Sequence, residues 1–128
     1  MATYPARSSG DQTVNYLRAP ITFAMGSSGV VQIGTLPAGA AVLRTYTVIS
    51  VVFNNATTNV LKIGTVASDA SIASTISTAA LGTTLGTLTA GAGLLPTVDT
   101  PLIATSFSTG AVATTGAGVV VVEYLPVA

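Results

Sequence analysis

Short runs of Val, Ile, Thr, Tyr and Phe, each closed by a cluster of Gly, Pro, Asn or Ser, recur along most of the chain. β-Branched and aromatic side chains suit a pleated sheet, whereas the closing clusters suit turns. The clusters return about every 8–12 residues, a spacing typical of an all-β sandwich. We therefore predict a jelly-roll-like β-sandwich of about seven or eight short strands. The strand candidates are Ile21–Met25, Val30–Leu36, Val42–Phe53, Val60–Val66, Thr83–Thr89, Leu102–Phe107 and Val119–Leu125.

Two features predict where strands lie within the sheets. The run Val42–Phe53 is the longest, and both of its alternating faces are partly apolar. Such a strand is expected in the middle of a sheet, covered on both sides. Pro96 and Pro101 predict the opposite for the stretch around them, because proline cannot donate a hydrogen bond to a ladder. We expect that stretch to be an edge strand or a loop.

One segment has a helical spacing of apolar residues. Ile72, Ile76 and Ala80 recur at every fourth position, and Asp69 precedes them as a candidate N-cap. The Ser and Thr residues between them disfavour a helix. The segment is predicted to be a short helix or an irregular loop, so the fold contains at most one short helix.

The first 20 residues differ from the rest of the chain. They carry Arg7 and Arg18, two of the four basic residues, and Pro5 and Pro20 bracket them. We predict an extended N-terminal arm over residues 1–20, followed by a single β-sandwich domain over residues 21–128. Tyr4 and Tyr16 are among the side chains with which this arm could dock on a neighbouring surface.

The ionisable residues offer little chemistry. The chain has no His and no Cys, which excludes an imidazole base, a thiol nucleophile, a disulfide and an ordinary zinc site. The four acidic residues, Asp11, Asp69, Asp99 and Glu123, are too far apart in sequence to indicate a catalytic carboxylate pair. We predict that the protein is not an enzyme and has no catalytic residues, cofactor or metal.

The low charge points instead to assembly with other proteins. Charged residues make up 6% of the chain, against roughly 25% in an ordinary soluble domain. The formal net charge is zero, which argues against binding to nucleic acid. The apolar runs, such as Val119–Val122, are far shorter than the roughly 20 residues of a membrane span, so no membrane contact is expected. A surface with so little charge suits a protein that is covered by partners.

Three charged residues leave alternatives open. Arg44 and Glu123 lie within otherwise apolar strand candidates. Each could point to solvent, or the two could pair with each other or across an interface. Asp99 lies between Pro96 and Pro101, where a local Asx-turn is the simplest interpretation.

Seven segments of the sequence together carry a resemblance to a known class of proteins. They are Ile33–Ala40, Val42–Arg44, Tyr46–Ser50, Phe53–Asn59, Leu61–Thr65, Ser68–Ala70 and Val119–Pro126. Together they resemble small structural proteins of tailed bacteriophages that decorate or cement the outside of the capsid. The resemblance implies a jelly-roll-like sandwich present in many copies at the joints between capsid subunits, as a homodimer or homotrimer. It also implies assembly in the bacterial host cytoplasm and a final place on the outer surface of the virion.

The function predicted from these features is binding. The protein is expected to contact the major capsid protein and copies of itself, and to bridge neighbouring shell subunits. The arm supplies the candidate contact residues, Tyr4, Arg7, Tyr16 and Arg18. The alternatives are a tail or head-fibre subunit of the same fold, and a carbohydrate-binding sandwich. The chain has no Trp and only 5% aromatic residues, which disfavours a sugar-binding platform.

Overall fold

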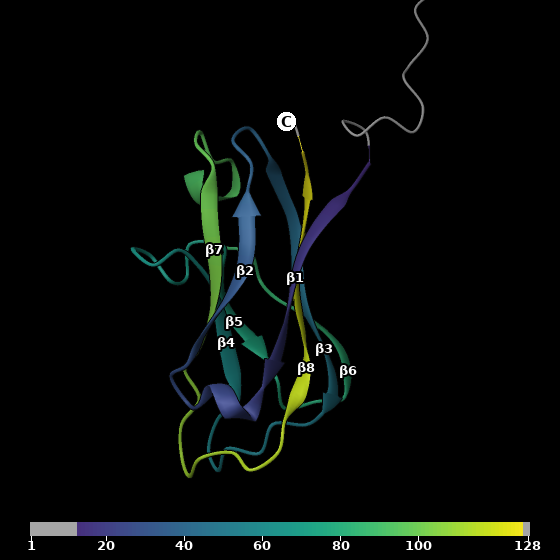
Figure 1. The fold of residues 1–128 in the computed structure, drawn as a ribbon, viewed down its shortest axis with the longest axis vertical. Coiled ribbons are helices and arrows are strands. Elements are labelled where there is room, and N and C mark those ends of the chain that lie inside the picture. Colours follow the sequence, from purple (N-terminus) through teal and green to yellow (C-terminus); the bar gives the residue numbers. More distant parts are fainter. Residues whose placement is uncertain (1–12, 127–128) are drawn as a thin grey trace, which may run out of the picture.

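The computed structural model describes residues 13–126, which form two four-stranded antiparallel sheets packed face to face (Figure 1). This confirms the predicted all-β sandwich. The two helical elements within these residues are single 3-10 turns, η1 (Phe23–Met25) and η2 (Ala92–Leu94). The strands are β1 (Asn15–Thr22), β2 (Val30–Leu36), β3 (Ala41–Val51), β4 (Val60–Gly64), β5 (Ala73–Ser77), β6 (Gly82–Leu85), β7 (Thr100–Ser106) and β8 (Ala117–Leu125).

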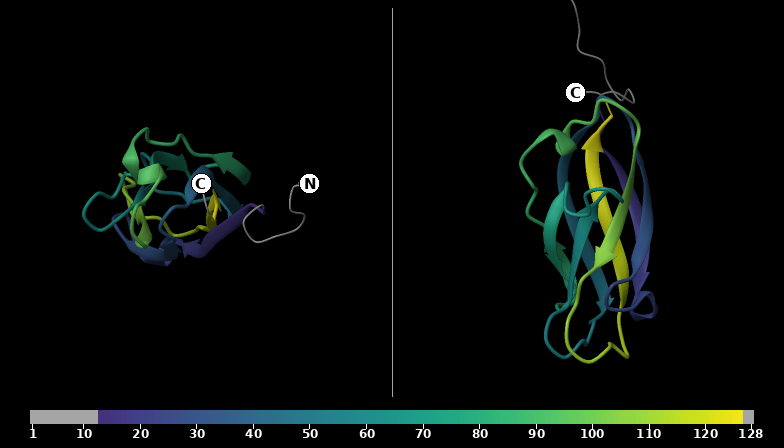
Figure 2. Two further views of the ribbon diagram at one scale, coloured as in Figure 1. Left: turned by 90° about the horizontal axis from the view of Figure 1, so that it is seen from above. Right: turned by 90° about the vertical axis from the view of Figure 1, so that its left-hand side faces the viewer.

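The strand pairing is that of a jelly roll. β1 pairs with β8, β2 with β7, β3 with β6 and β4 with β5, so the chain forms one long folded-back ribbon. Rolling that ribbon up gives a first sheet of order β1-β8-β3-β6 and a second sheet of order β2-β7-β4-β5. The strands of both sheets run along the long axis of the molecule (Figure 2).

The core lies between the sheets and consists of aliphatic side chains from both. Val120 and Val122 of β8 belong to the first sheet, and the second sheet contributes Leu36 from β2 and Leu61 and Ile63 from β4. All five side chains belong to the core and are at most 1% exposed. Successive residues of a strand face opposite sides, so Val120 and Val122 point into the core together, and Tyr124 follows them on the same side. Burying each such side chain is worth about 1.5–3 kcal/mol.

The longest strand lies in the middle of a sheet as predicted, but it is not covered on both of its faces. β3 lies inside the first sheet, between β8 and β6. Its inward residues are buried, but Val48 and Val51 on the outward side are 37% and 46% exposed. The second apolar face of the strand is therefore uncovered in the single chain.

The predicted helix or loop is a strand with a bulge. β5 pairs with β4 at Leu61↔Ile76 and Ile63↔Ala73, so β5 has one extra residue between these pairs. The bulge puts Ala73 and Ile76, three residues apart, on the same inward side, and this irregularity imitates helical spacing. Asp69 is consequently not a helix cap; its carboxylate lies 3.5 Å from the Lys62 ammonium.

Pro101 lies within β7, an interior strand, and not on an edge strand or in a loop as predicted. Its position still satisfies the rule for proline. β7 pairs with β4 only from Ile103 to Ser106, whereas Pro101 is paired with Thr35 of β2 alone. β7 is therefore locally an edge at Pro101, where no hydrogen bond is required of it on the β4 side.

The expected boundary between arm and sandwich falls earlier in the structure. β1 begins at Asn15 and pairs with β8 along its whole length, from Asn15↔Tyr124 to Thr22↔Ala117. Residues 15–20 thus belong to the first sheet, because Ala19 and Ile21 supply buried side chains to the core. Residues 1–12 lie outside the described residues, and an arm there stays a prediction.

Candidate interaction surface

The described charged side chains do not gather into a reactive centre. Among residues 13–126, no group of three or more acidic or other metal-ligating side chains could hold a metal ion. Over the same residues, no helix has the length and apolar character needed to cross a bilayer. The features that call for an explanation are apolar side chains left exposed on the surface.

The outward face of the first sheet carries the most ordered set of these apolar side chains. Residues that are directly paired in neighbouring strands point to the same side of a sheet. Val120 and Val122 point inward, so Val119 and Val121 point outward together with the residues paired to them. The resulting outward rows are Pro20–Val119–Val48–Thr83, Arg18–Val121–Tyr46–Leu85 and Thr22–Ala117–Val51.

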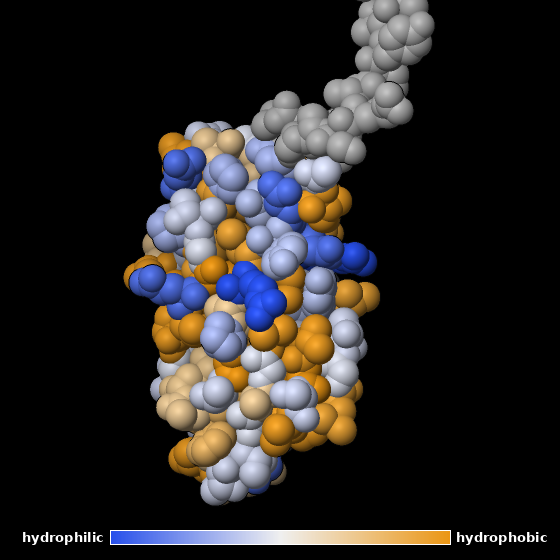
Figure 3. All heavy atoms as spheres, turned by 45° about the vertical axis from the view of Figure 1, so that its right-hand side comes forward, coloured by the Kyte–Doolittle hydropathy of each residue, from blue (hydrophilic) through white to orange (hydrophobic). Residues whose placement is uncertain are grey.

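We call Val48, Val51, Leu85 and Val119 the apolar face. Leu85 is 64% exposed, and Val48 and Val51 are also open to solvent. Figure 3 shows apolar side chains gathered over the lower half of the molecule, with hydrophilic ones above them. The free face of an antiparallel sheet is ordinarily polar, so an apolar one is a candidate contact surface.

A shallow depression lies at one end of the apolar face. Its volume is about 400 Å³, and Pro20, Val48, Ala117 and Val119 are among its lining residues. The lining is mainly apolar because β1, β3 and β8 all present small or aliphatic residues there. Such a depression can accept an apolar side chain of a partner, but it offers no charged group for chemistry.

The Arg44 and Glu123 alternatives resolve in favour of a pair. The Arg44 guanidinium donates hydrogen bonds to both carboxylate oxygens of Glu123, with Nη2 3.2 Å from Oε1. These bonds raise the pKa of Arg44 above its usual value. The Arg44 side chain also lies over the Tyr46 ring, 5.9 Å from its centre. The pair therefore forms a polar border beside the apolar face.

Two of the four predicted contact residues lie on this same side of the sheet. Tyr16 is paired with Glu123 and Arg18 with Val121, and both side chains are exposed on the outward face. Tyr4 and Arg7 lie outside the described residues. Sequence reasoning missed the apolar face itself, although the two apolar faces of Val42–Phe53 were the signal for it.

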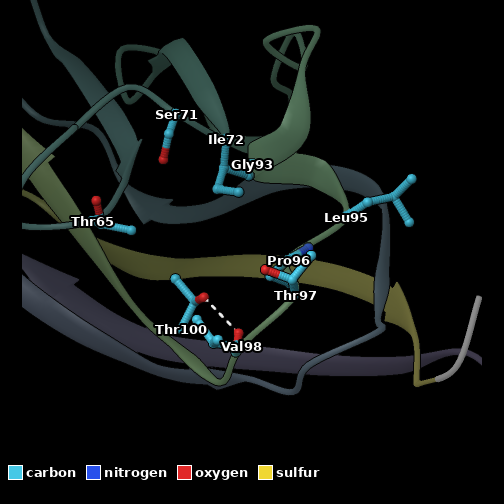
Figure 4. A pocket seen from close by; sticks show the side chains of 9 residues that line it. All are labelled: Thr65, Ser71, Ile72, Gly93, Leu95, Pro96, Thr97, Val98 and Thr100. Atoms are coloured by element: carbon cyan, nitrogen blue, oxygen red, sulfur yellow. Dashed lines mark hydrogen bonds between the residues drawn. The ribbon is translucent and has the colours of Figure 1, made fainter.

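A second apolar surface lies at the end of the second sheet, in the loops that precede β5 and β7. Val66, Leu95 and Val98 are 88%, 54% and 66% exposed. A hollow of about 290 Å³ opens between these loops, with Ser71 and Ile72 on one side and Pro96, Thr97 and Val98 on the other (Figure 4). We call it the loop hollow.

Asp99 stands beside the loop hollow. Its Oδ1 accepts a hydrogen bond of 2.9 Å from the backbone N–H of Ala38, across 61 residues of sequence. Asp99 therefore ties the loop before β7 to the turn between β2 and β3. Its Oδ1 atom accepts from this distant N–H and not from a neighbouring one, as the predicted local Asx-turn would require. The residue is exposed and also borders an adjoining depression lined by Val66, Val98 and Pro101.

Comparison with known proteins gives one informative likeness. No family model matches the chain, and no curated protein matches it. A solved structure of the cyanophage Pam1 capsid asymmetric unit contains a similar chain, with a TM-score of 0.62 and 24% sequence identity. The match covers 97% of this chain and 91% of that chain. At the level of the fold, this agrees with the resemblance to phage capsid-associated proteins, and the chain shares its sandwich with a capsid-derived chain over nearly the whole length of both.

Proposed function

We propose that the protein is a non-enzymatic structural protein of a virion that binds the outer capsid surface and bridges neighbouring major capsid protein subunits. The observation that carries this proposal is the uncovered apolar face on the first sheet. The fold shared with a chain of a cyanophage capsid supports the choice of partner. The low charge of the whole chain supports a protein whose surface is largely covered by other proteins.

The apolar face supplies the energy of the contact. Val48, Val51 and Leu85 lose water when a flat surface of the shell covers them, and stable contacts of this kind typically bury roughly 800 Å² on each partner. Because the protein binds only the closed arrangement of two shell subunits, its binding favours that arrangement by mass action. A modest energy for each copy becomes large over a whole shell.

The arm adds a contact with the capsid or with a neighbouring copy of this chain in the proposal. Tyr16 and Arg18 border the apolar face on β1, and Tyr4 and Arg7 come 11 and 8 residues before Asn15, the first residue of that strand. Eleven extended residues reach up to about 40 Å, which is enough to cross to a neighbouring subunit. Tyr and Arg are also the residue types most often found to carry binding energy at protein interfaces.

Copy number in native particles tests the proposal. Particles that contain this chain are purified and sedimented, and the chain is quantified by mass spectrometry against the most abundant shell protein. A ratio within a few-fold of one supports a cement protein that covers the shell. A few copies per particle would instead indicate a tail or fibre subunit, and absence from particles would overturn the structural role.

A second measurement tests the mechanism. Shells assembled without this protein are mixed with the purified protein and then heated. The protein is expected to raise the temperature at which the shells open, and to do so in proportion to its occupancy. Saturating binding that leaves the opening temperature unchanged would contradict a cementing role.

A further inference from the structure

Two described charged side chains lack an ionic partner. Arg44 is paired with Glu123 and Lys62 with Asp69, which leaves Arg18 and Asp99 among residues 13–126. Arg18 lies on the outward face of the first sheet, and Asp99 lies in the loop that leads into β7 of the second sheet. The two residues carry opposite charges and are each next to an exposed apolar surface.

Around Asp99, the loop hollow provides the shape for a protruding side chain. Its volume of about 290 Å³ is lined largely by Ile72, Leu95, Pro96 and Val98, with hydroxyl groups from Thr65, Thr97 and Thr100 at its border. Thr100 Oγ1 donates a hydrogen bond of 2.8 Å to the Val98 carbonyl, which fixes the wall next to Asp99 (Figure 4). An aromatic ring with one polar end matches such a lining.

Around Arg18, β1 provides a side chain of that kind. Tyr16 is 59% exposed and points to the same side as Arg18, two residues away. Alternate residues of a strand are about 6.6–7 Å apart, so both side chains can reach one surface together. β1 is also an edge strand of the first sheet, which makes this row accessible to a neighbour.

We propose that two copies of this chain bind head to tail, with Tyr16 of one copy in the loop hollow of the next and Arg18 against Asp99. The Oδ1 atom of Asp99 keeps its bond to Ala38, and Oδ2 accepts from the guanidinium. Because the two surfaces are different parts of the molecule, the contact is heterologous, and repetition around an axis closes a ring. The contact uses the β1 side of the first sheet and leaves Val48 and Leu85 of the apolar face for another partner.

This inference deepens the self-association that belongs to the proposed function by naming the two surfaces. Charge reversal tests it on the purified full-length protein, with masses measured by native mass spectrometry and sedimentation equilibrium. The wild type is expected to form a closed oligomer. Arg18→Glu and Asp99→Arg are each expected to weaken association by about tenfold or more, because each brings like charges together.

Recombining the charges is the decisive step. The double variant Arg18→Glu/Asp99→Arg is expected to regain association to within a few-fold of the wild type. An equimolar mixture of the two single variants is also expected to associate, because each retains the surface that the other lacks. A monomeric wild type, or single variants that stay fully assembled, would overturn the head-to-tail contact, as would a double variant that fails to reassociate.

Matched controls separate the contact from the fold. Asp99→Asn keeps an acceptor for the Ala38 N–H and removes only the charge, so it is expected to weaken association while unfolding like the wild type. Val30→Thr, an exposed position on β2 outside both proposed surfaces, is expected to leave association unchanged. Because no capsid is present, failure here leaves the capsid proposal standing, whereas absence from particles would not affect this contact.

Discussion

The apolar face makes a quantitative prediction for a double variant, Val48→Thr/Leu85→Thr. Threonine suits a strand and adds no charge, so the change lowers the apolar content of the face and little else. Both side chains are exposed in the single chain, so the free energy of unfolding is expected to change by less than about 0.5 kcal/mol for each site. The effect is expected in the affinity for the shell.

The size of that effect follows from the exposed fractions. Leu85 is 64% exposed and Val48 is 37% exposed, so together they offer a partner about as much apolar surface as one whole aliphatic side chain. Burial of one such side chain is worth about 1.5–3 kcal/mol. The dissociation constant is therefore expected to rise about 10- to 150-fold, at 1.4 kcal/mol for each factor of ten.

The assay is a binding isotherm on shells assembled without the protein, with bound and free protein separated by sedimentation. Val30→Thr is the matched control, because Val30 is 56% exposed on β2 of the other sheet, outside the apolar face. The reasoning is refuted if the double variant binds as tightly as the wild type. It is equally refuted if Val30→Thr weakens binding as much as the double variant does.

Five further substitutions test the account of stability by chemical denaturation. Thr47→Val is expected to destabilise the protein by about 1 kcal/mol because its hydroxyl donates to a carbonyl of β5, whereas Thr45→Val is expected to be neutral or stabilising because that buried hydroxyl has no partner among the described residues. Gly110→Ala is expected to cost at least about 1 kcal/mol more than Gly26→Ala. Both glycines have a positive φ, but only at Gly110 would the new Cβ meet backbone, at 2.5 Å. Ile63→Ala, at a fully buried position, is expected to cost about 2–5 kcal/mol.

The two exposed apolar surfaces have different characters, and this difference supports different partners. The apolar face is broad, lies on the three paired strands β8, β3 and β6, and has a polar border at Arg44 and Glu123. The loop hollow is narrow, lies between loops and has a single carboxylate beside it at Asp99. A broad rigid face suits a large flat partner such as a shell, and a narrow hollow suits one protruding side chain.

Sequence patterns went wrong where a local irregularity changed the side on which residues point. The spacing of Ile72 and Ile76 predicted a helix or loop, but Ile76 lies in β5, where a bulge opposite Leu61 and Ile63 puts it on the inward side together with Ala73. Pro101 predicted an edge strand or loop, but β4 ends before it, so an interior strand accepts it. Both outcomes depend on the neighbouring strand, which is far away in sequence.

The sequence by itself determined the class of fold and the absence of imidazole and thiol groups. Strand content and turn spacing are local properties, and a chain without His or Cys lacks those side chains in any fold. Only the tertiary structure decided which apolar side chains are covered. Val48 and Val120 both belong to valine-rich strand candidates, yet one faces outward at 37% exposure and the other is fully buried. Pairing and sheet packing make that choice, because a strand has two faces and the second sheet covers only one of them.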